Sequence, residues 1–195
     1  VPKGEAYKKS RTLAREKMLS VATALMGEEF DDNTLIVATS GRNEFRNKGL
    51  DAFIDAVNVV RTDLRDKERK VLAFIMVPAW TDKASPKLVD ALKEGKCERQ
   101  DNALVTHFIH NFESDNVYQK MCSLGFTNLG EDNVKLIYVP CYLNGDDGIF
   151  NLSYYDLIPG FDLTVFASYY EPWGYTPLES IAFGVPTVTT DLAGF

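Results

Sequence analysis

Two glutamates, Glu171 and Glu179, flank a short aromatic turn whose residue types suit the binding of a charged ligand. Thr176 can cap a helix through its hydroxyl, and Pro177 suits the first helical position because no N–H donor is needed there. Glu179 then falls at the third helical position, where it would complete a capping box with Thr176. The pattern predicts a helix that begins near Pro177, with Glu171 outside it and facing the same cleft.

The turn itself, Trp173-Gly174-Tyr175, lies where the first N–H groups of this predicted helix would point. Gly174 lets a ligand approach the backbone, and the helix dipole favours an anion such as phosphate. Tyr175 can stack on a nucleotide base or pack on its ribose, with packing in the core as the alternative. Trp173 belongs to the same ligand-binding turn, chiefly as its packing anchor.

Two cationic residues, Arg42 and Lys48, follow an apolar run at 35–38 that is typical of a buried strand. Apolar residues at helical spacing begin at Leu50, so the chain passes from a strand through a polar loop into a helix. Ligands of open α/β sheets bind at the carboxyl ends of the strands, which places Arg42 and Lys48 well for a diphosphate. The alternative is that both are solvated loop charges.

The composition indicates one globular α/β domain. The chain has 195 residues, of which 45% are hydrophobic and 25% charged, as in an ordinary protein with one sizeable core. A formal net charge of -7 argues against a general binder of nucleic acid or of acidic membranes. The spacing of Cys97, Cys122 and Cys141 fits neither a disulfide framework nor a metal site, which favours a cytoplasmic location.

The order of elements predicts a Rossmann-like, doubly wound parallel sheet. An amphipathic helix comes first, within 1–27, and helical patterns lie between most of the strands, which we expect at 35–39, 71–77, 134–139, 163–167 and 185–189. Residues 61–70 are interpreted as the solvated end of a helix and a turn, and 144–148 as a surface loop.

We expect two helices between 78 and 126, the second of them long. His107 and His110 would lie on that second helix as an H-x-x-H pair. A zinc site needs three or four ligands, and only Glu113 lies close in sequence. The pair is therefore interpreted as structural, and no metal is expected.

The segment SYYEPWGYTPLESIAFGVPTVTTDLAGF at 168–195, together with GRNEFRNKG at 41–49, resembles the glycogen synthase family of fungi and animals and its bacterial relatives. Members are retaining glycosyltransferases with two facing Rossmann-like domains, the GT-B fold. The resemblance implies that 1–195 is a single, truncated nucleotide-sugar-binding domain without the N-terminal acceptor domain. A terminus at Phe195, directly after Gly194, and the lack of an initiating methionine also predict a chain cut from something longer.

The resemblance also implies residue roles. Arg42 and Lys48 would hold the donor diphosphate, Glu171 would contact glucose hydroxyls, and Glu179 would bind the donor ribose, in competition with its helix-capping role. Gly174, Tyr175, Thr176 and Trp173 would complete the donor site. The implied reaction transfers glucose from UDP-glucose, or from ADP-glucose, to the 4-hydroxyl of an α-1,4-glucan such as glycogen, with retention of configuration and without a cofactor.

Two other functions stay open at this level. One is a different retaining GT-B transferase, such as a starch-synthase-like or sucrose-synthase-like enzyme or a mannosyltransferase. The other is a nucleotide-binding module that is inactive alone, because a transition state stabilised from two sides loses most of its stabilisation without one wall. Homo-oligomerisation of the full-length form is also left open.

Overall fold

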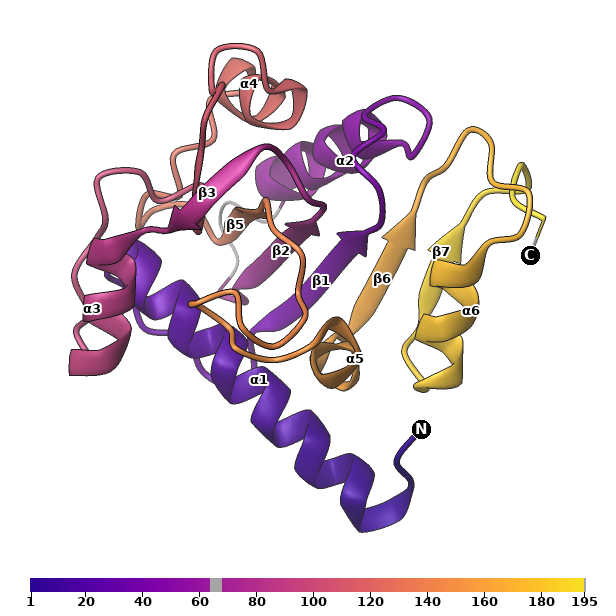
Figure 1. The fold of residues 1–195 in the computed structure, drawn as a ribbon, viewed down its shortest axis with the longest axis horizontal. Coiled ribbons are helices and arrows are strands. Elements are labelled where there is room, and N and C mark those ends of the chain that lie inside the picture. The colour runs from indigo at the N-terminus through magenta and orange to yellow at the C-terminus, as the bar shows by residue number, and fades with distance from the viewer. Residues whose placement is uncertain (64–67, 195) are drawn as a thin grey trace.

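The computed structural model describes residues 1–63 and 68–194. Its centre is a five-stranded, entirely parallel sheet with the strand order β5-β2-β1-β6-β7 (Figure 1). The strands are β1 (Leu35–Ser40), β2 (Val71–Met76), β5 (Val134–Val139), β6 (Leu163–Phe166) and β7 (Thr187–Thr189). All five predicted strands are confirmed, although the last begins at Thr187 instead of Val185.

Helices cover both faces of the sheet, which confirms the doubly wound prediction (Figure 1). In β2, Leu72, Phe74 and Met76 pack on one face, whereas Ala73 and Ile75 pack on the other, because successive side chains of a strand point to opposite faces. The first face is covered by α1 (Gly4–Met26), α3 (Pro86–Glu94), α5 (Tyr154–Leu157) and the 3-10 turn η1 (Ile158–Gly160), and the second by α2 (Leu50–Asp63) and α4 (Asn116–Ser123).

The first helix, α1, is tied to the sheet by two arginines as well as by its apolar face. Arg15 is buried and donates to the carbonyl oxygens of Gly160, Asp32 and Thr34. Its guanidinium also pairs with Asp162 at 2.8 Å, and Arg11 reaches the same carboxylate at 2.6 Å. Within the described ranges, no helix combines the length and the hydropathy needed to cross a bilayer.

The prediction of a long second helix before residue 126 is wrong for most of that helix. His107–Ile109 forms a short strand, β4, that pairs antiparallel with β3 (Thr81–Ala84), and α4 begins only at Asn116. The reason is long-range backbone pairing: Tyr138 of β5 donates to the Leu104 carbonyl at 2.8 Å and accepts from the Thr106 N–H at 3.2 Å. Contacts with β5, and not a helix, therefore produce the apolar spacing of this segment.

The charged segment 61–70 is only partly as expected. Helix α2 ends at Asp63, and residues 64–67 lie outside the described residues. Arg61 is not solvated: its guanidinium lies 4.1 Å from the centre of the Phe126 ring and donates to the Leu124 carbonyl at 2.7 Å. Arg61 thus joins the end of α2 to the segment after α4, because a guanidinium can satisfy carbonyls and an aromatic face together.

Candidate functional site

The candidate site lies where the strand order reverses. From β1 the chain continues to β2 and β5 on one side and returns to β6 and β7 on the other. The loops after β1 and β6, residues 41–49 and 167–174, leave the sheet at the same edge (Figure 1). Such a switch point at the carboxyl ends of parallel strands is where open α/β sheets bind ligands.

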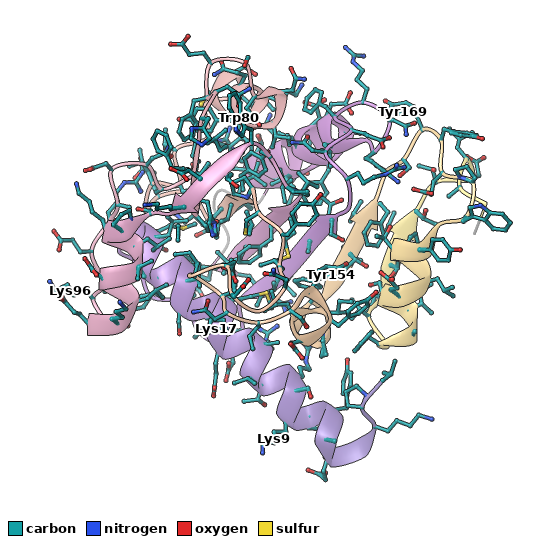
Figure 2. The ribbon with its side chains drawn as sticks, viewed as in Figure 1. Lys9, Lys17, Trp80, Lys96, Tyr154 and Tyr169 are labelled. Carbon is teal, nitrogen blue, oxygen red and sulfur yellow. The ribbon has the colours of Figure 1, made fainter. Side chains whose placement is uncertain are left out.

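The two loops are in direct contact. Tyr169, on the loop after β6 (Figure 2), donates its backbone N–H to the Asn47 carbonyl of the other loop at 2.9 Å. Gly49 lies so close to this loop that a Cβ atom there would stand 1.8 Å from the Ala167 carbonyl oxygen, and its φ is 62°. Only glycine combines a positive φ with the lack of a Cβ atom, so Gly49 allows the two loops to approach this closely.

Lys48 and Glu171 form an ion pair across this contact, with only 12% and 16% of their side chains exposed. Burial, followed by the charge of Arg42, holds the pKa of Lys48 below its ordinary value, while Glu44 acts in the opposite direction. The Glu171 carbonyl accepts from the Gly194 N–H at 2.7 Å, so the backbone of Glu171 is also fixed. Two predicted site residues, 123 positions apart, therefore meet.

A cleft of about 670 Å³ opens at this edge, between the ends of β1, β2 and β5 and the helix α6 (Tyr175–Ala182). Arg42 lines it from the loop after β1, while Thr176 and Glu179 line it from α6. An anionic ligand in this cleft would meet a guanidinium that can form two parallel hydrogen bonds with phosphate oxygens. Of the residues predicted from sequence, Arg42, Thr176 and Glu179 thus line the cleft, whereas Lys48 and Glu171 form the adjacent ion pair.

The predicted start of α6 and its capping box are wrong. The helix begins at Tyr175, because Gly174 occupies the N-cap position with a left-handed φ of 62° and makes no side-chain cap. Thr176 therefore lies inside the first turn, too late to cap it. The Glu179 carboxylate instead accepts from the Tyr155 hydroxyl at 2.7 Å, which removes the capping role as the competitor of a ligand-binding role.

The aromatic residues of the turn are exposed. Trp173 is 74% exposed, so its interpretation as a packing anchor is wrong, and Tyr175 at 66% is not part of the core. Both residues flank Gly174, whose left-handed conformation turns the chain into α6. Exposed rings next to Thr176, which lines the cleft, are available for stacking on a planar ligand.

Sequence reasoning missed several residues of the cleft. Ser40 and Tyr154 share a hydrogen bond of 2.6 Å between their hydroxyl oxygens, and Tyr154 lies on α5 (Figure 2). Burial raises the pKa of Tyr154 to about 12, so its hydroxyl stays protonated. The missed signal was Ser153-x-x-Asp156, a capping box that starts α5 and brings Tyr154 to the cleft.

The histidines do not form the expected pair on a helix: His107 lies in β4 and is buried, and His110 follows this strand. The ligand atoms of His107, Cys141 and Asp147 lie within 4.8 Å of one another. Hydrogen bonds explain this cluster. The His107 ring contacts the Thr106 hydroxyl and the Asp147 carbonyl oxygen, both at 2.8 Å.

Asp147 has a structural role in the predicted surface loop 144–148. One carboxylate oxygen accepts from the N–H groups of Ile149 and Phe150, and the other accepts from Asn151, at 2.9–3.0 Å. Burial is the main reason that the pKa of His107 lies below its ordinary value and that the pKa of Cys141 is raised to about 12. The Asp147 carbonyl and both of its carboxylate oxygens already accept hydrogen bonds or contact the His107 ring, so the cluster is best explained by loop packing.

Comparison with known proteins places these residues in a family. The family model described as "Glycogen synthase" matches residues 24–101 and 87–195. The chain belongs to the glycogen synthase family. Among curated members it is 32% identical to "Glycogen [starch] synthase" of Neurospora crassa over 84% of this chain, and 29% identical to the liver protein of Homo sapiens over 86%. The chain spans about a third of these relatives, 31% of each.

A solved structure also superposes on this member of the glycogen synthase family. It is the C-terminal domain of a group 1 glycosyl transferase, LpcC, from Francisella tularensis, with 18% identity and a TM-score of 0.47. The superposition covers 95% of this chain and 67% of that domain.

Proposed function

We propose that residues 1–195 form a single nucleotide-sugar-binding domain, the donor-binding half of a cytoplasmic glycogen synthase with the GT-B fold. The enzyme transfers glucose from UDP-glucose to the 4-hydroxyl of an α-1,4-glucan with retention of configuration. Family membership supports the proposal. The single observation that carries it is the convergence of Arg42, Glu179 and the Lys48–Glu171 pair at the switch point of the sheet.

The proposed roles follow from charge and position. Arg42 and Lys48, with the N–H groups at the start of α6, stabilise the negative charge that develops on the departing diphosphate. Glu179 accepts from the donor ribose, and Glu171 accepts from glucose hydroxyls after it separates from Lys48. The exposed ring of Tyr175 stacks on the base.

Retention of configuration in this proposal needs no covalent intermediate. The departing phosphate assists the incoming 4-hydroxyl on the same face of the sugar, within the field of the two cations. A double displacement would instead require a carboxylate on the opposite face of the glucose ring. The glucan acceptor binds to the second wall of the cleft in the whole enzyme, so we expect this domain alone to bind the donor and to transfer no glucose.

Calorimetry of residues 1–195 with UDP tests the proposal. We expect binding that Arg42→Ala weakens by roughly 10-fold or more, since removing a charged hydrogen-bond partner costs about 1.5–3 kcal/mol. Arg46→Ala is the matched control, because Arg46 is an exposed cation of the same loop that does not line the cleft. An equal loss of UDP affinity in the two variants would mean that only the overall charge of the domain matters, and it would contradict the proposed site.

Transfer assays on the full-length enzyme, with UDP-glucose and ADP-glucose in parallel, test the reaction. We expect faster glucan extension from UDP-glucose. Turnover of GDP-mannose without turnover of either glucose donor would assign the enzyme to a different transferase activity.

A further inference from the structure

One carboxylate, Glu44, lies among the cations of the loop after β1 and has no role in the function proposed above. Its Oε1 contacts the Arg42 Nε at 3.1 Å, and its Oε2 accepts from the Asn47 side-chain amide at 2.6 Å. Its carbonyl accepts from the Lys48 N–H at 2.8 Å. Glu44 therefore contacts Arg42 and Asn47 with its side chain and Lys48 with its backbone.

The contact with Glu44 restrains an Arg42 side chain that is otherwise largely exposed. Its side chain is 76% exposed, and a long exposed side chain loses considerable rotamer freedom when a ligand fixes it. The shortest contact with Glu44 is made by the Nε atom of the guanidinium. The Nη pair is one edge with which arginine makes two parallel hydrogen bonds to phosphate oxygens.

Asn47 links this arrangement to the other half of the site. Its amide donates to Glu44, and its backbone carbonyl accepts from Tyr169 on the loop that carries Glu171. The hydrogen bond from Asn47 is the largest cause that keeps the pKa of Glu44 below its ordinary value, with the charges of Arg42 and Lys48 acting in the same direction against burial. Glu44 is thus held as a carboxylate by the partners that it orients.

We propose that Glu44 is a positioning residue, which holds the Arg42 guanidinium with its Nη groups available to the donor diphosphate. The inference rests on the proposed function of the cleft. It predicts an effect opposite in sign to that of simple electrostatics. A negative charge beside an anion site repels the anion, so removing a bystander carboxylate would tighten diphosphate binding. Removing a positioning carboxylate weakens it.

The test is a double-mutant cycle on residues 1–195, with UDP affinity measured by calorimetry. Glu44→Gln keeps an oxygen that can accept from Asn47 but removes the charge that faces Arg42. We expect it to weaken UDP binding roughly three- to tenfold with Arg42 present, as for residues in direct contact, and not to weaken it in the Arg42→Ala background. The melting temperatures of all four proteins show whether the fold is kept.

The full-length enzyme supplies a second measurement. Arg42 would act most strongly on charge that develops in the transition state, so Glu44→Gln should lower kcat more than it raises KM for UDP-glucose.

Several outcomes overturn the inference. Tighter UDP binding by Glu44→Gln would make Glu44 a bystander charge, and equal weakening with and without Arg42 would make its role purely structural. Either result leaves the proposed function intact. If Arg42→Ala itself leaves UDP affinity unchanged, both the inference and the proposed donor site are wrong.

Discussion

Glu171→Gln is expected to strengthen the binding of free UDP while it abolishes glucose transfer. In the unliganded domain the Glu171 carboxylate neutralises Lys48, so a diphosphate has to displace it before it can use that charge. Glutamine leaves Lys48 without this competitor. The sugar contacts proposed for Glu171 do not concern UDP, which carries no glucose, so affinity and turnover should change in opposite directions.

The burial of the Lys48–Glu171 ion pair determines how large the change in UDP affinity should be. Exposed ion pairs contribute up to about 1 kcal/mol, whereas removing one partner of a fully buried pair costs about 3–5 kcal/mol. The side chains of Lys48 and Glu171 are 12% and 16% exposed, which places the pair between these limits. A release of about 1.4 kcal/mol on UDP binding corresponds to roughly tenfold tighter affinity.

Calorimetry of residues 1–195 measures this change, and transfer assays on the full-length enzyme measure the loss of turnover. Glu179→Gln is the matched control, since Glu179 lines the cleft but its carboxylate accepts from a tyrosine hydroxyl. We expect this control to weaken UDP binding through the lost ribose contact. Unchanged or weaker UDP binding by Glu171→Gln would refute the idea that Glu171 competes with the diphosphate for Lys48.

Three further predictions concern the framework of the site. Gly49→Ala should lower the free energy of unfolding by more than about 2 kcal/mol and weaken UDP binding, because the Cβ would overlap the opposite loop. Gly125 has a similar φ but open space around it, so Gly125→Ala should lower the free energy of unfolding by only about 1 kcal/mol, as measured in urea. The pKa of His107 is lowered in the folded state, so below its ordinary value of 6.5 the unfolded chain binds the proton more readily, and stability decreases as the pH decreases. His107→Gln should reduce this loss of stability, measured as the change in urea midpoint between pH 7.5 and 5.5. The same substitution at the exposed His110 should not reduce it. Asp162→Asn should lower the free energy of unfolding by about 3 kcal/mol, as for a largely buried charge network, and a loss below about 0.5 kcal/mol in thermal or urea melts would contradict the anchoring of α1.

Local sequence patterns were enough to predict the layers of this domain. Apolar runs of strand length alternate with helical spacing, and in a parallel sheet both faces are buried, so β2 is apolar throughout and β5 is apolar except for Lys135. The apolar runs and the helical spacing depend only on residues that lie within a few positions of one another. The same is true of the Glu171-to-Glu179 spacing and of the cationic loop, both of which could be found without coordinates.

The errors arose where partners distant in sequence decide the local structure. Leu104 and Thr106 pair with β5, some 30 positions later, and this pairing overrides an apolar spacing that resembles a helix. The start of α6 depends on the left-handed conformation of Gly174, a backbone choice that composition permits but does not require. Exposure of Trp173 follows from that same choice.

The sequence by itself determined which charges this domain carries and that they follow strands or precede helices. Only the tertiary structure decided which of them meet. Lys48 and Glu171 lie together because β6 inserts next to β1 and Gly49 allows the two loops to touch. Strand order results from packing across the whole sheet, and residue spacing along the chain holds no record of it.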